Sequence, residues 1–406
     1  MLENKKETHL FILWENAREK EKEILQDIQE KFTILGMYAI TWKKETFSQN
    51  LSRFYGTNLP PHCGKEQHCG NGEFLLVVVE VDNPQYEIRQ TSKGPQKVNV
   101  SMFDQKTKYR EMTGGGHKVH ATNSEKETDH DLTLLLGKSV QDYRKEKQET
   151  STTQKITLQQ ELIGYDGFST VTEMFYVLNH CLDYAILRNY ETIPEEIYVN
   201  DHNDIDIICY SYQDAAYVLN AQKVFPEEYR IHYQVKVENR LAFFDFRYVG
   251  DQYYHYAIEK QILEKRVFQK KGFYTIDDEN YFFTLLYHAL LHKKEFSPEY
   301  QERLKKMKPH YTERLQNQEQ ATKLLESWLW EKGYSITRPI DVSVQFNETK
   351  VKQMNPILFP QDTSLLATIQ EKEEQNEQLR QELHQMANSL SWKITKPIRD
   401  WRTKTK

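Results

Sequence analysis

This chain contains little cysteine, and it has neither long apolar runs nor an excess of positive charge. Four cysteines in 406 residues fit the reducing cytoplasm and exclude a disulfide-rich scaffold. No stretch of about 18 apolar residues occurs, so no segment is expected to span a membrane. The chain opens on a charged segment, so no signal peptide is expected. The formal net charge of −6 excludes a general affinity for polyanions, and no nucleic-acid partner is expected.

The apolar segments that are present predict an α+β fold of about two or three domains. Residues 1–143 alternate between strand-like and helix-like patterns in an order that favours a ferredoxin-like split βαβ arrangement. The polar residues 144–155 are predicted to be a linker. In this first domain the predicted strands and helices lie at 9–14, 17–35, 37–42, 74–81 and 125–136.

Residues 156–310 are predicted to form a second domain, of α/β type, which begins with helical spacing at about 169–187. Residues 311–362 are predicted to be a helical and irregular extension. In residues 363–390, apolar side chains recur in alternating steps of three and four, which predicts a short coiled coil with another copy or another chain. The architecture is therefore two mixed domains followed by a helical C-terminal region.

Two carboxylates stand two residues apart in the apolar segment 203–208, which reads Asn-Asp-Ile-Asp-Ile-Ile. Residues two apart in a strand point to the same face, so Asp204 and Asp206 are predicted to lie together. A second apolar strand about forty residues later carries Asp245 at its centre. Three carboxylates on neighbouring strands repel one another unless a cation lies between them, and a divalent cation that bridges nucleotide phosphates is the usual one.

These residues resemble the nucleotidyltransferase superfamily, in which paired acids on one strand and a third acid on the next hold Mg²⁺ against a nucleotide. The resemblance assigns Asp204, Asp206 and Asp245 to the catalytic metal site. Asn189 stands where the family has a glycine, and asparagine tolerates the left-handed turn needed there. Three cationic side chains are candidates for nucleotide phosphates, with ordinary ion pairing as the alternative. They are Arg188, Arg247 and Lys293.

Two further sets of residues allow a metal-binding interpretation. His288 and His292 stand four apart on one predicted helix face, where a metal-binding pair is possible, but no HExxH glutamate accompanies them. His62-Cys63 and His68-Cys69 match the spacing of no common zinc module and lie among glycines, which favours a loop.

Residues 116–132 resemble the active-site segment of nucleoside diphosphate kinases. There a histidine accepts a phosphoryl group and a glutamate eleven residues later orients its ring; here His120 and Asp131 occupy the two positions. Arg110 approximates one of the family's phosphate-binding residues. The family's Lys-Pro-Asp after the first strand is replaced by Trp14-Glu15-Asn16, so the resemblance supports the fold better than the kinase activity.

Residues 391–406 are a basic segment with six Lys or Arg and two tryptophans. The order Ser-x-Ser-Trp-Lys-x-Thr-x-Pro-x-Arg from residue 389 resembles the tails of bacterial enzymes that make capsule, O-antigen and related surface polysaccharides. Each positive charge contributes about 1 kcal/mol at an anionic inner leaflet, so peripheral association with the cytoplasmic face of the membrane is expected. A solvated basic end is the alternative.

Together these features predict a cytoplasmic, Mg²⁺- and nucleotide-dependent transferase that acts on a glycan or sugar acceptor in surface-polysaccharide synthesis. Two alternatives stay open. The chain could be a non-catalytic scaffold for glycosyltransferases that docks through residues 363–390, or a glycosyltransferase that uses a nucleotide sugar. An acid on a separate strand, Asp245, favours phosphorus chemistry.

Overall fold

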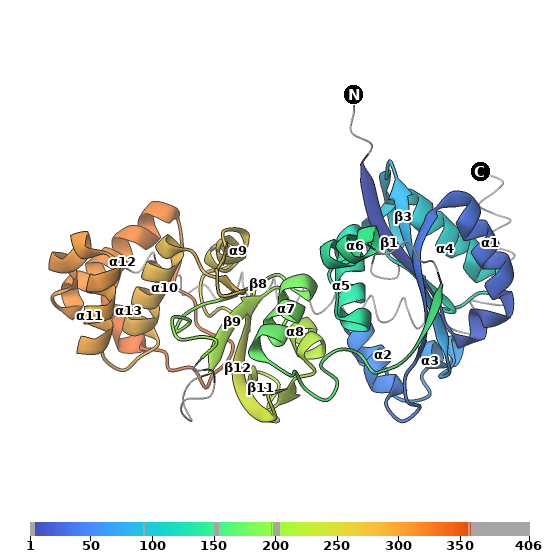
Figure 1. The fold of residues 1–406 in the computed structure, drawn as a ribbon. Coiled ribbons are helices and arrows are strands. Elements are labelled where there is room, and N and C mark those ends of the chain that lie inside the picture. Colours follow the sequence, from blue (N-terminus) through green and yellow to red (C-terminus); the bar gives the residue numbers. More distant parts are fainter. Residues whose placement is uncertain are drawn as a thin grey trace, which may run out of the picture.

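The computed structural model describes residues 5–355 and 358, except for 92–93, 150–153, 196 and 198–203. The predicted coiled coil (363–390) and basic tail (391–406) lie outside the described residues. Within the described part, no helix has both the length and the apolar composition needed to cross a bilayer. The α+β class is confirmed, and Figure 1 shows two sheets with helices packed against each.

The first sheet has five strands in the order β6-β1-β3-β2-β7. β1 pairs antiparallel with β3 and β6, and β3 pairs antiparallel with β2. This is the strand order of a split βαβ arrangement. β7 adds to the edge, parallel to β2. The strands are β1 (Lys6–Leu13), β2 (Thr33–Thr41), β3 (Phe74–Asp82), β6 (Val119–Ala121) and β7 (Lys155–Gln159).

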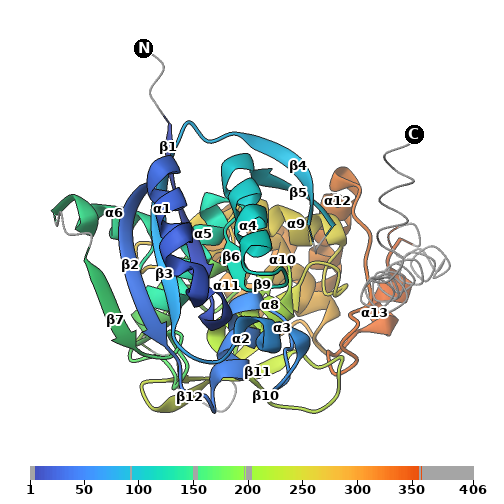
Figure 2. The same ribbon diagram turned by 90° about the vertical axis from the view of Figure 1, so that its right-hand side faces the viewer.

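Helices cover both faces of this sheet because its central strands bury apolar side chains on both sides. The helices α1 and α4 pack on one face (Figure 2), and α2, α5 and α6 pack on the other. A short hairpin, β4–β5, precedes α4. The elements are η1 (Glu15–Lys20), α1 (Glu21–Lys31), α2 (Phe47–Tyr55), α3 (Gly64–Cys69), β4 (Tyr86–Thr91), β5 (Gly94–Asn99), α4 (Val100–Met112), α5 (Glu125–Leu136) and α6 (Val140–Glu149).

The second sheet has seven strands in the order β10-β11-β12-β9-β8-β14-β13. Its centre is a parallel pair, β9 and β12, flanked by the antiparallel neighbours β8 and β11. The strands are β8 (Tyr184–Ile186), β9 (Ile205–Cys209), β10 (Gln222–Lys223), β11 (His232–Val237), β12 (Arg240–Tyr248), β13 (Val267–Phe268) and β14 (Tyr274–Thr275).

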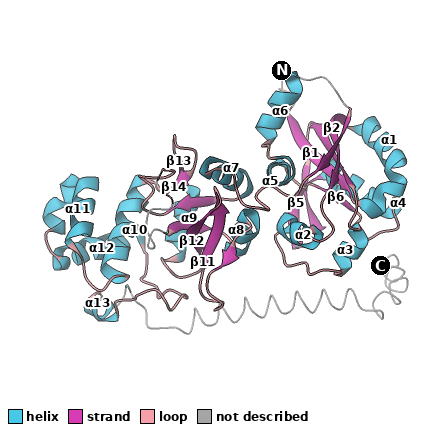
Figure 3. Ribbon diagram, turned by 60° about the horizontal axis from the view of Figure 1, so that its bottom comes forward, coloured by secondary structure: helices cyan, strands magenta, loops and turns pink. Residues whose placement is uncertain are grey.

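The alternation of side chains along β9 decides which helices cover each face of this sheet. Ile205 and Ile207 join the core under α7 and α8, whereas Ile208 joins the core formed with α9 and α10. Helices α11 to α13 continue that second core at the end of the molecule (Figures 1 and 3). These helices are α7 (Val171–Cys181), α8 (Tyr212–Leu219), α9 (Tyr256–Glu264), α10 (Asp278–Leu291), α11 (Pro298–Met307), η2 (Pro309–Leu315), α12 (Gln318–Lys332) and α13 (Glu348–Gln353).

The two sheets share one apolar core, which runs from α2, α5 and α6 through α7 and α8. A buried arginine, Arg53 of α2, crosses this boundary. Its Nε donates to the carbonyl of Tyr217 at 3.0 Å, and its Nη2 donates to the carbonyls of Val218 and Ile163 at 3.0 and 2.7 Å. The last carbonyls of a helix have no partner within the helix, so Arg53 caps the end of α8 from the first half of the chain.

Four of the predicted boundaries are wrong. The helix predicted at 17–35 ends at Lys31, because β2 begins at Thr33 rather than at 37. Residues 144–155 are not a linker throughout, because α6 continues to Glu149 and β7 begins at Lys155 and joins the first sheet. The helical spacing at 169–187 ends at Cys181, since the next residues form β8 and pair with β9. The boundary at 310 cuts through η2, which packs with α10 and α12 in one helical unit.

Candidate functional sites

The acids of β9 and β12 lie side by side. In the parallel register, Asp245 is paired with Asp206, and both lie on the sheet face that α9 and α10 cover. The alternate isoleucines Ile205 and Ile207 are buried on the opposite face and fix this orientation. Asp206 is 6% exposed and Asp245 is 9% exposed, so two carboxylates are held at the sheet centre with little access to water.

A candidate cation site forms around Asp245 with a set of residues that differs from the predicted one. Ligand atoms of Asp204, His232 and Asp245 all lie within 4.8 Å of one another, and Asp206 is not a member of this group. His232 begins β11 and pairs with Asp245 across the antiparallel ladder, which brings its Nε2 to 3.3 Å from Asp245 Oδ1. Asp245 Oδ1 is buried and has no hydrogen-bond partner among the described residues.

The electrostatics of these carboxyls show the need for a positive partner. Burial raises the pKa of Asp206, and the charge of Asp245 raises it further, against the opposing effect of Arg188. Burial likewise raises the pKa of Asp245, with Arg247 and His232 opposing and Asp204 adding to the rise. A buried carboxylate stays charged when a cation compensates its lost hydration. The carboxylate and imidazole donors around Asp245 are chemically suited to hold a divalent cation.

Two arginines share this face. Arg188 Nη2 donates to Asp206 Oδ1 at 2.6 Å. Arg247, which is 3% exposed, lies between Asp245 and Asp251, with N–O distances of 3.6 Å to each. Those distances are long for hydrogen bonds, and Nε and Nη1 of Arg247 are buried without a hydrogen-bond partner in the described part of the chain. A guanidinium in this state has hydrogen-bond donors left for an anion such as phosphate.

Asn189 and Lys293 occupy the rim of this region. Asn189 has φ +58°, so it adopts the left-handed conformation expected at the glycine position of the family, and its side chain accepts a hydrogen bond from Arg303. This segment follows strand β8. Lys293 lies just beyond the end of α10 and is exposed, and its charge lowers the pKa of Asp206. Lys293 is therefore near enough to act on Asp206, whereas Asn189 is linked to the acid pair only through its neighbour in sequence, Arg188.

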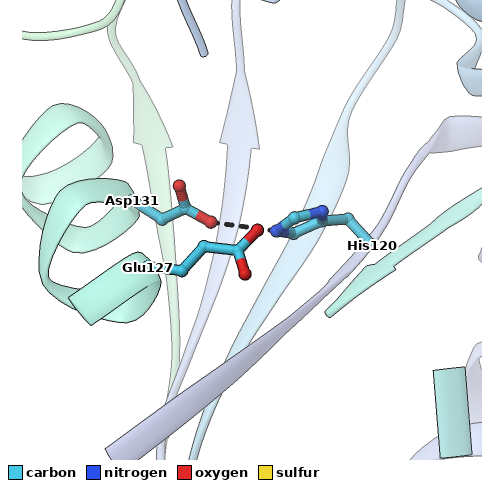
Figure 4. A group of neighbouring side chains, drawn as sticks. All are labelled: His120, Glu127 and Asp131. Carbon is cyan, nitrogen blue, oxygen red and sulfur yellow. Dashed lines mark hydrogen bonds and ion pairs between the residues drawn. The ribbon is translucent and has the colours of Figure 1, made fainter. Parts of the chain in front are cut away.

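A second candidate site lies in the first domain, around His120. His120 is on β6, and Asp131 is on α5; the two join through a 2.9 Å contact between Nε2 and Oδ2 (Figure 4). Asp131 Oδ1 also lies 2.9 Å from Nδ1 of His130. Burial would raise the pKa of Asp131, but the hydrogen bonds of His120 and His130 outweigh burial and lower it. A charged carboxylate therefore orients the His120 ring through Nε2, and Nδ1 is the ring nitrogen that does not contact Asp131.

Glu127 completes this second cluster. It lies one turn before Asp131 on α5, and ligand atoms of Glu127, Asp131 and His120 lie within 4.8 Å of one another (Figure 4). The rings of Phe54 and Tyr55 pack edge-on against His120. These three groups are the second set in the described residues that could hold a cation.

Arg110, the approximate counterpart of a phosphate-binding residue in the kinase family, contacts the backbone of the chain beside His120. Arg110 Nε donates to the carbonyl of Val119 at 2.8 Å, next to His120 in the sequence. Glu15, which follows the first strand where the kinase family has a lysine motif, accepts hydrogen bonds from the backbone of Asn71 and Gly72. The backbone of the loop at Asn71 and Gly72 therefore binds the carboxylate of Glu15, which belongs to the chain itself.

The remaining metal interpretations find no support in the described residues. His288 and His292 are buried on α10, and burial lowers the pKa of both well below the ordinary value. His288 Nδ1 is 2.7 Å from the hydroxyl of Tyr253, as in a satisfied core histidine. Cys63 and Cys69 lie at the start and the end of the short helix α3, where a loop was predicted, and belong to neither of the two candidate metal groups found in the described part.

Sequence reasoning missed His232, Glu127 and Asp341, which lies beside His232. A weak sequence signal for His232 exists in Asn239, a residue type that tolerates a hairpin turn, and in the structure Glu238 and Asn239 both have positive φ. Counting back from such a turn pairs His232 with Asp245. No sequence signal points to Asp341, because it reaches the site from a segment about a hundred residues away.

Comparison with protein-family models finds no match, and comparison with curated protein sequences finds none either.

Proposed function

We propose that the chain is a divalent-cation- and nucleotide-dependent transferase, of the nucleotidyl or phosphoryl type, with its reaction centre at Asp204, Asp206 and Asp245. The observation that carries the proposal is the register of β9 and β12, which pairs Asp206 with Asp245 at the centre of a buried sheet. Such closely placed acids are suited to hold Mg²⁺ and, through it, nucleotide phosphates.

The arginines supply the complementary part of the site. Arg188 now neutralises Asp206 through one hydrogen bond, and a nucleotide phosphate is an alternative partner, which a guanidinium can bind in a bidentate manner. When Arg188 binds phosphate, the carboxylate of Asp206 becomes available to the cation. Arg247 and Lys293 add positive charge on the same side of the sheet. An acceptor hydroxyl would then lose its proton to one of the acids.

The first domain is proposed to be nucleoside diphosphate kinase-like and to bind a nucleotide or a phosphorylated partner at His120. The second is proposed to be nucleotidyltransferase-like. The proposed setting is the cytoplasmic face of the membrane, with residues 391–406 as a peripheral anchor and a surface-polysaccharide glycan or sugar as the acceptor. The ordered β6–α5 junction and the Asp131-oriented imidazole support the first of these assignments.

Labelled nucleotides test the proposal. The full chain is incubated with each nucleoside triphosphate carrying an α- or γ-phosphate label, with Mg²⁺ or Mn²⁺, and with glycan acceptors. Transfer of the α-label identifies nucleotidyl transfer, and transfer of the γ-label identifies phosphoryl transfer. We expect Asp245→Asn to lower the rate at least about 10³-fold, because it removes a charge at the cation.

The matched control is Asp214→Asn, an exposed acid at the start of α8 in the same domain, which should leave the rate unchanged. Metal-independent transfer, or an unchanged rate in Asp245→Asn, would remove the proposal. No nucleotide binding by calorimetry, together with co-purification of glycosyltransferases, would favour the scaffold function instead.

A further inference from the structure

The His232 ring packs edge-on against Phe225, and this packing leaves its Nδ1 buried without a hydrogen-bond partner among the described residues. It stands at the first position of β11, directly opposite Asp245, with its side chain 20% exposed. Its Nε2 faces Asp245 Oδ1 at 3.3 Å, and the third member of the group, Asp204, is the most exposed of the three. The imidazole thus closes one side of the carboxylate cluster.

A second buried acid approaches the other nitrogen of the same ring. Asp341 is 3% exposed and comes from the segment between α12 and α13. Its Oδ1 accepts hydrogen bonds from the backbone and hydroxyl of Ser343. Its Oδ2 lies 3.9 Å from His232 Nδ1, and both of these atoms are buried without a hydrogen-bond partner among residues that the structure describes.

We propose that His232 Nε2, Asp204 and Asp245 form one cation site, and that Asp341 orients the imidazole from behind. In metal sites, a ligating histidine almost always donates its other N–H to a carboxylate or carbonyl, which fixes the tautomer and makes the ligand more basic. The orphaned Asp341 oxygen lies where that partner is needed. A movement of about 1 Å brings the pair to hydrogen-bond distance.

The donor set selects the class of cation. Mg²⁺ prefers oxygen ligands and keeps several waters, whereas imidazole nitrogen suits transition metals. Two carboxylates with one imidazole therefore favour Mn²⁺ or a similar transition-metal ion over Mg²⁺. This inference refines the metal of the proposed function and rests on it only for the identity of the reaction, since binding can be measured alone.

Mn²⁺ is the probe. Pulsed electron paramagnetic resonance of Mn²⁺ bound to the full chain reports a ¹⁴N coupling when an imidazole is a ligand. The measurement is made in a His120→Gln background, because the His120 group is the other one in the described chain that could bind the ion. We expect the coupling to be present in this background and absent when His232→Gln is added.

Calorimetry gives the second readout. His232→Gln should weaken Mn²⁺ binding about 100-fold and Mg²⁺ binding by less than about threefold. Asp341→Asn keeps all three ligands, so it should retain the ¹⁴N coupling while Mn²⁺ affinity falls about tenfold. If His232→Gln does not fold, as judged by circular dichroism, the His120→Gln and Asp341→Asn measurements carry the test.

Mn²⁺ bound without ¹⁴N coupling in His120→Gln, or no Mn²⁺ binding at all, would overturn the inference, as would a coupling that survives His232→Gln. The failure of the proposed function is distinguishable. Loss of the coupling in His232→Gln with no transfer activity in the intact chain supports the cation site and removes the transferase. Transfer activity with Mg²⁺ in a chain that shows no ¹⁴N coupling supports the transferase and removes the cation site.

Discussion

The guanidinium of Arg188 lies 2.6 Å from the carboxylate of Asp206, and the pair is almost entirely enclosed by the protein. Burial would lower the pKa of Arg188, but the charge of Asp206 outweighs burial, and the pKa of the arginine is raised well above its ordinary value. Each group therefore keeps its charge because of the other, and the removal of one leaves an uncompensated charge in the interior.

Arg188→Met should lower the free energy of unfolding by about 3 kcal/mol at neutral pH, because Asp206 then remains buried without a cation. The double variant Arg188→Met/Asp206→Asn should recover part of that loss, since neither charge is left. Urea titrations of the four proteins give the coupling energy directly. Additive effects of the two substitutions would contradict the pairing, and Arg314→Met, at an exposed position, is the control.

Arg53→Met should destabilise the chain by about 3 kcal/mol, because three carbonyls lose a charged donor in a site closed to water. Since the two sheets share one core, urea unfolding should remain a single transition for probes in both halves. Arg240→Met, with a side chain 60% exposed, is the matched control. Independent unfolding of the halves in the wild-type chain would refute the shared core.

Glu259 gives the chain a predictable dependence on pH. Burial and the nearby charge of Asp251 raise its pKa to about 9, from an ordinary value of 4.5. Between these two values the folded chain holds a proton that the unfolded chain releases, so the contribution to stability is full below about pH 4.5 and declines as the pH rises toward 9.

In the wild-type chain the free energy of unfolding should fall as the pH rises from 5 to 9. Glu259→Gln should therefore make this slope shallower by up to about 1.4 kcal/mol per pH unit. Urea titrations across that range measure the slope. Glu264→Gln, at the exposed end of the same helix, should keep the wild-type slope. The same slope in Glu259→Gln would show that this carboxyl is already ionised in the folded chain.

His120 should take the label when the chain is incubated with γ-phosphate-labelled ATP and Mg²⁺, because Asp131 holds Nε2 and leaves Nδ1 to attack phosphorus. The label should be labile in acid and stable in base, as expected of a phosphohistidine. His120→Gln should abolish it. His130→Gln, which removes the other histidine bound to Asp131, should retain it. Label that persists in His120→Gln would exclude this histidine as the acceptor.

Much of the α+β architecture, and the orientation of Asp206, follows from local sequence patterns. The strands at β1, β2 and β3 and the helix α5 were predictable because apolar periodicity depends on neighbours in sequence. The orientation of Asp206 was equally predictable, since alternation along a buried strand is local. The strand β8 was not, because it forms only by pairing with β9.

The membership of the candidate cation site was decided by tertiary structure. The sequence by itself determined that Asp206 and Asp245 would each lie on an apolar strand, whereas the parallel register of β9 and β12 put the two acids on one face. The sequence could not show that Arg188 would bind Asp206, or that His232 and Asp341 would take places beside Asp245. Those contacts join segments separated by up to about a hundred residues, and their distances depend on how the sheet, the hairpin and the C-terminal segment pack together rather than on any local pattern.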